Sequence, residues 1–179
     1  IFGALKNFNI KKGSTVGILG IGGLGHLGIK FGKKLGYKMV GITETKTKLK
    51  DITKLGSNEA YHFNQFIKFK NKFDYLIITS HHNYDWKAVI KPMAYDSTLC
   101  FVSRPSKDLK LNVFDFMSKR IKITASPGSS KKNMVEMLKM SAKYNIYPNI
   151  QEFKIKEINL AIKRLIQNKI RYRAVMKVF

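Results

Sequence analysis

Three glycines, Gly20, Gly22 and Gly25, stand at the spacing G-x-G-x-x-G, which suits a loop that holds a phosphate-bearing ligand. The first glycine allows a tight turn from strand to helix, and the second lets the backbone approach a pyrophosphate. The third allows the helix and the strand to pack closely. Free N–H groups at the start of the helix would then bind phosphate oxygens. A glycine-rich turn without a ligand is the alternative.

The residues on either side of the glycines have the pattern that such a loop requires. Residues 16–19 form a short apolar run, which is typical of a buried parallel strand. Residues 24–35 follow with apolar side chains at helical spacing, and Gly36 is placed to end that helix. A strand before the glycines and a helix after them favour a dinucleotide-binding loop over a simple turn.

The segment 43–48, which reads Thr-Glu-Thr-Lys-Thr-Lys, bears on the type of dinucleotide. It lies roughly 20 residues beyond the glycine loop, where an acidic residue would bind the ribose hydroxyl of NAD. Small hydroxyl side chains and lysines suit the 2′-phosphate of NADP instead. Glu44 leaves NAD open as the alternative, because a carboxylate pointing into the site would repel that phosphate. We predict NADP.

Strands and helices alternate along most of the chain. We expect strands at 38–43, 60–63, 73–79, 97–103 and 121–125, and helices at 46–55, 86–93 and 133–144. This alternation predicts an α/β fold, a doubly wound parallel sheet of the Rossmann type.

The alternation ends after Pro148. We expect a strand at 150–154, a helix at 156–167 and a strand at 174–179. We therefore divide the chain into a dinucleotide-binding domain, residues 1–145, and a C-terminal segment, residues 146–179.

Composition and charge limit the class of protein. The chain has 179 residues, of which 44% are hydrophobic, so it can bury a real core. No apolar run approaches the ~18 residues of a membrane span, and no signal-peptide pattern is present, so we expect a cytoplasmic protein without a membrane partner. The single cysteine, Cys100, lies in an apolar stretch and is expected to be a buried structural thiol.

The basic residues outnumber the acidic ones by 34 to 11, which gives a net charge of +23. Such a field attracts nucleotide phosphates, nucleic acid or an acidic surface. The lysines are spread along the chain, however, as generic surface residues would be. Since no recognition helix, stacking aromatic motif or zinc finger accompanies the charge, we expect no nucleic-acid partner.

Four stretches, 16–27, 73–79, 123–138 and 168–178, make the chain similar to the zinc-type medium-chain alcohol dehydrogenases, and most of all to the cinnamyl alcohol dehydrogenase branch. The Gly-His pair at 25–26 is one of the more specific signals. The resemblance implies a zinc-dependent, NADP-linked interconversion of a small alcohol and its aldehyde by hydride transfer. We also expect a homodimer formed through the edge of the sheet.

The resemblance implies which residues of this chain contact the cofactor, and we add Gly20, the first glycine of the loop, to them. These residues are, for the pyrophosphate, Gly20, Gly22, Gly23, Leu24 and Gly25; for the 2′-phosphate, Thr43, Thr45 and Lys48; beside the nicotinamide, Thr79 and Val102; in the loop after the sixth strand, Ser126 and Ser130; and, reaching the phosphates, Arg173.

The departures from the family concern zinc. In the family a cysteine, the histidine of a Gly-His-Glu motif and a second cysteine or acid hold the catalytic zinc, and a four-cysteine lobe holds a structural zinc. All of these precede the glycine loop, and this sequence contains none of them. We therefore expect no catalytic residue or metal ligand here, zinc only in the full-length protein, and a C-terminal segment that returns toward the absent catalytic domain. A truncated nucleotide-binding module without chemistry is the alternative.

Two histidine positions could suggest other chemistry. His26 stands at the start of the helix beside the glycine loop, where we expect it to pack or to cap. His81 and His82 are adjacent, and neighbouring loop residues rarely bind one metal ion together. We expect these two to belong to a solvated loop.

Overall fold

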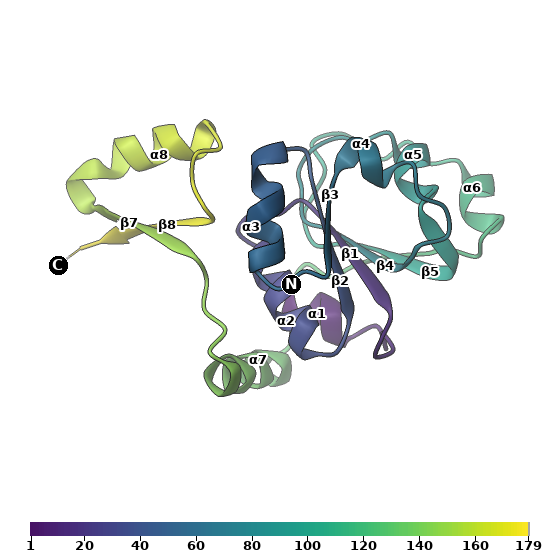
Figure 1. Ribbon diagram of the computed structural model, residues 1–179, viewed down its shortest axis with the longest axis horizontal. Helices are drawn as coiled ribbons and strands as arrows, with labels where there is room; N and C mark the ends of the chain where they lie inside the picture. The colour runs from purple at the N-terminus through teal and green to yellow at the C-terminus, as the bar shows by residue number, and fades with distance from the viewer. Residues whose placement is uncertain (179) are drawn as a thin grey trace. The chain divides into compact units, whose positions relative to one another are not determined.

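A parallel sheet of six strands organises residues 1–146, the first unit of the chain (Figure 1). The computed structural model describes residues 1–178. The strands lie in the order β3-β2-β1-β4-β5-β6, so the chain runs from the middle to one edge and then crosses to the other half. This order confirms the doubly wound Rossmann fold.

The strands of this unit are β1 (Thr15–Leu19), β2 (Lys38–Thr43), β3 (Glu59–His62), β4 (Phe73–Ile78), β5 (Met93–Phe101) and β6 (Lys122–Ala125). The helices are α1 (Phe2–Lys6), α2 (Gly25–Lys34), α3 (Leu49–Lys54), α4 (Phe63–Phe66), α5 (Trp86–Ile90), α6 (Val113–Met117) and α7 (Lys131–Tyr144), and the 3-10 turn η1 (Lys46–Lys48) precedes α3.

The two central strands hold the core of the unit. All of β1 after Thr15, and β4 from Tyr75 to Ile78, are buried, as expected for strands that helices cover. Burying each large aliphatic side chain contributes about 1.5–3 kcal/mol. The carboxyl ends of β1 and β4, where the order of the strands reverses, therefore project from the buried centre of the sheet.

The structure differs from the predicted elements at several ends. The helix expected over 86–93 ends at Ile90, with Lys91 as its cap, because Pro92 has no N–H to continue the helical hydrogen bonds. The next strand begins at Met93 rather than at 97, and Met93 pairs with Phe73 across an irregularity in the register. The helices α1, α4 and α6 were not predicted, because four or five residues are too few to show a helical period.

Residues 147–178 form a second unit. It comprises β7 (Ile150–Lys154), the 3-10 turn η2 (Ile155–Glu157), α8 (Ile158–Ile166) and β8 (Arg173–Lys177). The two strands pair in parallel, and Phe153, Ala161 and Ile170 form a small core. That this unit returns toward a catalytic domain stays a prediction.

Among the helices of residues 1–178, none combines the length and the apolar character needed to cross a membrane.

Candidate functional site

The glycine loop begins where β1 ends. Gly20 has φ +103°, a backbone conformation that favours glycine, and its N–H donates to the Ile42 carbonyl of β2 at 3.0 Å. The chain then turns through Gly22 into α2, whose first residue is Gly25. The loop is thus tied to a neighbouring strand before the helix begins.

Glycine is favoured at positions 22 and 25 of the loop for different reasons. A Cβ on Gly25 would collide with the Gly20 carbonyl oxygen, so this glycine is needed for the fold itself. A Cβ on Gly22 would meet nothing within 4 Å among the described residues. Gly22 therefore borders open space, as a position that a ligand approaches should.

Thr79, the first residue after β4, contacts the glycine loop from the carboxyl end of the strand next to β1. Its N–H donates to the Leu19 carbonyl at 2.9 Å. Its hydroxyl lies 3.2 Å from the same carbonyl and donates to the Gly20 carbonyl. Thr79 thus fixes the peptide at which the chain leaves β1.

Replacing Thr79 with valine, which has nearly the same shape, is expected to lower the free energy of unfolding by about 1–3 kcal/mol, because the Gly20 carbonyl loses its hydroxyl donor. Urea denaturation measures the change. Thr53→Val is the control, because that hydroxyl donates only to an exposed helical carbonyl, and its loss should cost less. An equal cost for both variants would contradict the role given to Thr79.

His26 stabilises the same loop from inside. Its side chain is fully buried, and the ring Nδ1 lies 2.9 Å from the Gly22 carbonyl oxygen. Its backbone N–H donates to the same oxygen at 3.1 Å. Because the carbonyl only accepts, Nδ1 carries the proton of this hydrogen bond. The side chain therefore has the packing role expected from the sequence.

The segment predicted to bind the 2′-phosphate lies against this loop. Thr43 ends β2, is buried, and accepts a hydrogen bond from the Thr45 N–H at 3.1 Å. The Lys48 ammonium reaches back to the Ile21 carbonyl of the glycine loop at 3.4 Å. The structure therefore brings the glycine loop and an ammonium group together at one edge of the sheet.

The Glu44 side chain faces His82, which lies in the loop that follows β4. One carboxylate oxygen lies 3.7 Å from His82 Nε2, and this contact is an ion pair when His82 is protonated. The backbone carbonyl of Glu44 accepts from His62 Nε2 at 3.1 Å. His82 in turn lies against the ring of Tyr84, whose pKa is raised to about 12 by burial, so its hydroxyl stays protonated at neutral pH.

The remaining predicted contacts fall in three places. Val102 directly follows β5 and donates to the Ile78 carbonyl at 3.0 Å, and Ser126 directly follows β6 and donates to the Phe101 carbonyl at 2.8 Å. Both lie at the carboxyl ends of strands, as Gly20 and Thr79 do. The Ser130 hydroxyl accepts from the Asn133 N–H at 3.2 Å and so caps α7. Arg173 opens β8 of the second unit, and its contact with phosphates stays a prediction.

An apolar cavity beside Val102 was not predicted from the sequence. It has a volume of about 590 Å³ and is walled by the ends of β5 and β6 and the segments that follow them. Leu109 and Pro127 line it, and both come from loops, where sequence periodicity carries no signal. A flat ring placed beside Val102 would lie against this wall.

Zinc does not fit the residues of this chain that the structure describes. Within residues 1–178 no three side chains of His, Cys, Asp or Glu gather as a metal site would require. His81 Nδ1 lies 2.9 Å from the Arg104 carbonyl, while His82 faces Glu44. Cys100 is fully buried, and burial raises the pKa of its thiol, as expected for a structural cysteine.

A family profile described as "Zinc-binding dehydrogenase" matches residues 23–143. An aldehyde reductase AdhA of Synechocystis is 28% identical, and the match covers 98% of this chain and 53% of that protein. A probable mannitol dehydrogenase 1 of Stylosanthes humilis is 32% identical over 99% of this chain and 52% of its own length. An NADP-dependent alcohol dehydrogenase C 1 of Mycolicibacterium smegmatis is 26% identical over 98% of this chain and 51% of its own.

Solved structures show the same fold. A cinnamyl alcohol dehydrogenase from Helicobacter pylori, complexed with NADP(H), is 29% identical with a TM-score of 0.86, over 98% of this chain and 51% of that one. The enzyme SbCAD4 from Sorghum bicolor matches with a TM-score of 0.87 at 23% identity, over 93% of this chain and 48% of that one, which shows the fold alone. This chain therefore spans about half the length of the relatives that it matches.

Proposed function

The chain belongs to the zinc-binding dehydrogenase family, and we propose that it is the NADP-binding half of a zinc-dependent alcohol dehydrogenase. Its relatives are alcohol and aldehyde dehydrogenases, and the portion matched is the half that binds the cofactor. The observation that carries the proposal is the glycine loop, in which Gly22 borders open space while the Lys48 ammonium lies against the neighbouring Ile21 carbonyl.

NADP fits the residues at this edge of the sheet. The N–H groups of 22–25 would hold the pyrophosphate, because they lie at the start of α2, where backbone donors and the helix dipole favour an anion. Thr43, Thr45 and Lys48 would hold the 2′-phosphate. Thr79 and Val102 would lie beside the nicotinamide ring, which supplies the hydride transfer when the cofactor is bound, and Ser126 would contact the cofactor from the loop after β6. The protein's part is to hold and orient these groups.

Two observations support NADP over NAD. The Lys48 ammonium offers a positive charge to a phosphate, whereas the Glu44 carboxylate is directed to His82. In addition, the Helicobacter structure is a complex with NADP(H), and the Mycolicibacterium relative is an NADP-dependent alcohol dehydrogenase.

Zinc and the substrate belong, in this proposal, to the part of the protein that corresponds to the other half of the relatives. The substrate would be a small alcohol or aldehyde. We expect no turnover of alcohol from residues 1–179 alone, and zinc-dependent turnover by this purified chain would contradict that expectation.

We also propose a homodimer through β6, which is an edge strand of the sheet and exposes Ile123. Light scattering of the purified protein tests the dimer.

Calorimetric titration of the purified protein with NADPH and with NADH tests the cofactor assignment. We expect one site that binds NADPH at least tenfold more tightly than NADH, a difference of about 1.4 kcal/mol. Equal or tighter binding of NADH would overturn the choice of NADP. Failure of a folded sample to bind either dinucleotide would overturn the proposed function.

Replacing Lys48 with methionine is expected to weaken NADPH binding by roughly tenfold and to leave NADH binding nearly unchanged. A hydrogen bond to a charged group is worth ~1.5–3 kcal/mol, and the lower end applies because Lys48 is partly exposed. The control is Lys46→Met, which removes an exposed lysine from the same 3-10 turn. If Lys46→Met and Lys48→Met weaken NADPH equally, the effect comes from general charge and not from a contact of Lys48.

A further inference from the structure

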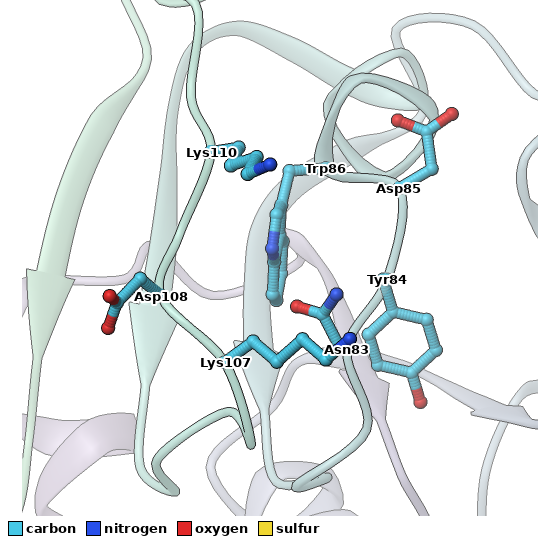
Figure 2. Close-up of a pocket in the computed structure, with 7 residues that line it drawn as sticks. All are labelled: Asn83, Tyr84, Asp85, Trp86, Lys107, Asp108 and Lys110. Carbon is cyan, nitrogen blue, oxygen red and sulfur yellow. The ribbon is translucent and has the colours of Figure 1, made fainter.

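A second pocket lies apart from the glycine loop, between segments 83–86 and 107–110 (Figure 2). The first segment leads into α5, and the second belongs to the loop that follows β5. The pocket has a volume of about 510 Å³. This volume lies within the range of ~300–1,000 Å³ that is usual for small-molecule sites.

Three hydrogen-bond donors of this pocket have no protein partner among the described residues. The Trp86 side chain is only 3% exposed, yet its indole Nε1 has no hydrogen-bond acceptor. Figure 2 shows the ring edge that carries this nitrogen turned toward segment 107–110. Lys110 extends from that segment toward Trp86, and Lys107 extends below the ring toward Asn83. Neither lysine makes a hydrogen bond or an ion pair within residues 1–178. Buried donors are nearly always paired, so the Trp86 N–H indicates an acceptor that the chain does not supply.

The two carboxylates beside the pocket do not neutralise the lysines. Asp85 accepts a hydrogen bond from the Lys87 N–H at 3.1 Å and thereby caps α5. Figure 2 shows the carboxylates of Asp85 and Asp108 both directed away from Trp86. The lining therefore combines two exposed ammonium groups, the buried indole N–H and the Asn83 amide, and of these groups only the Asn83 oxygen can accept a hydrogen bond.

We propose that this pocket binds a small molecule that carries a dianionic group, a phosphate or a dicarboxylate. Two ammonium charges match the charge of such a group, and one of its oxygens supplies the acceptor that the buried Trp86 N–H lacks. The rings of Trp86 and Tyr84, whose centroids are 5.9 Å apart, provide an apolar wall for the rest of the molecule. No residue of the pocket belongs to the glycine loop or to segment 43–48, so the proposal does not depend on NADP binding.

Trp86 is the only tryptophan of the 179 residues, so its fluorescence reports directly on this pocket. The purified protein is titrated with inorganic phosphate and with malonate at constant ionic strength, with sodium chloride as the control. We expect a saturable change of the emission with at least one dianion and none with chloride. Tighter binding of phosphate indicates a phosphorylated ligand, and tighter binding of malonate indicates a dicarboxylate.

The double variant Lys107→Met/Lys110→Met is expected to bind the dianion at least tenfold more weakly. Both lysines are exposed, and circular dichroism verifies that this variant is folded. Lys87→Met, which removes an exposed lysine from α5, should bind as the unmodified chain does. Trp86→Phe, followed by calorimetry, should also weaken binding because it removes the N–H and keeps a ring.

Three results would overturn the proposal. The first is no saturable response to either dianion, or the same response to chloride. The second is unchanged affinity in the folded Lys107→Met/Lys110→Met variant. The third is loss of the response in Lys48→Met, which would place the anion at the cofactor segment instead. Because NADPH titration is measured separately, failure here leaves the test of the cofactor site intact.

Discussion

Replacing Gly22 with alanine is expected to weaken NADPH binding at least tenfold, or about 1.4 kcal/mol, while the melting temperature of the protein stays unchanged. A Cβ at this position meets nothing within 4 Å among the described residues, so the fold has room for the methyl group. The methyl group would instead occupy the space through which the pyrophosphate approaches the backbone. The substitution therefore separates binding from folding.

Calorimetry with NADPH and a thermal melt without ligand measure the two quantities for Gly22→Ala. Unchanged affinity would mean that the dinucleotide does not approach the loop at Gly22. A large fall in the melting temperature would mean that the protein itself needs this space, and the binding result would then lose its meaning. Only weaker binding by an equally stable protein agrees with the proposed site.

Replacing Gly25 with alanine is expected to lower the free energy of unfolding by about 3 kcal/mol, at the upper end of the usual cost of overpacking. The added Cβ would collide with the Gly20 carbonyl oxygen and would lie 3.2 Å from the Thr79 hydroxyl oxygen. Neither atom can move freely, because the Thr79 hydroxyl donates to the Gly20 carbonyl. For a domain of this size, such a loss lowers the melting temperature by roughly 6–12 °C.

Urea denaturation of Gly25→Ala gives this free energy, and Gly22→Ala is the matched control, since both place a methyl group in the same loop. We expect the Gly25 variant to be clearly less stable than the Gly22 variant. Equal stabilities would show that α2 can shift away from Gly20 at little cost, and that the third glycine is not needed for close packing.

The fold and the glycine loop could be predicted because both depend on local pattern. The apolar run of β1, the glycine spacing and the helical period of α2 lie within 20 consecutive residues, from Thr15 to Lys34. The helix predicted over 24–35 is observed as Gly25–Lys34. The cap of α7 also had a local signal, because Ser130 stands three residues before Asn133, whose N–H it accepts.

The contacts that could not be predicted join segments that are distant in the sequence. Spacing does not show that Lys48 reaches Ile21 or that Glu44 faces His82, because both contacts depend on how the strand ends meet at the switch point. The pocket at Trp86 is a further example, since its lysines follow the next strand, β5. Side-chain direction at such places is a property of the packed sheet and not of any one segment.

Amide hydrogen exchange with and without NADPH tests most directly whether the glycine loop holds the dinucleotide. We expect saturating NADPH to slow exchange in residues 20–26 and 43–48, and the same experiment on Gly22→Ala, at the same NADPH concentration, to show less protection there. NADPH should slow exchange less at 43–48 in Lys48→Met than in the unmodified chain. A folded protein that gains no protection in residues 20–26, or that is protected only elsewhere, would contradict the proposed function.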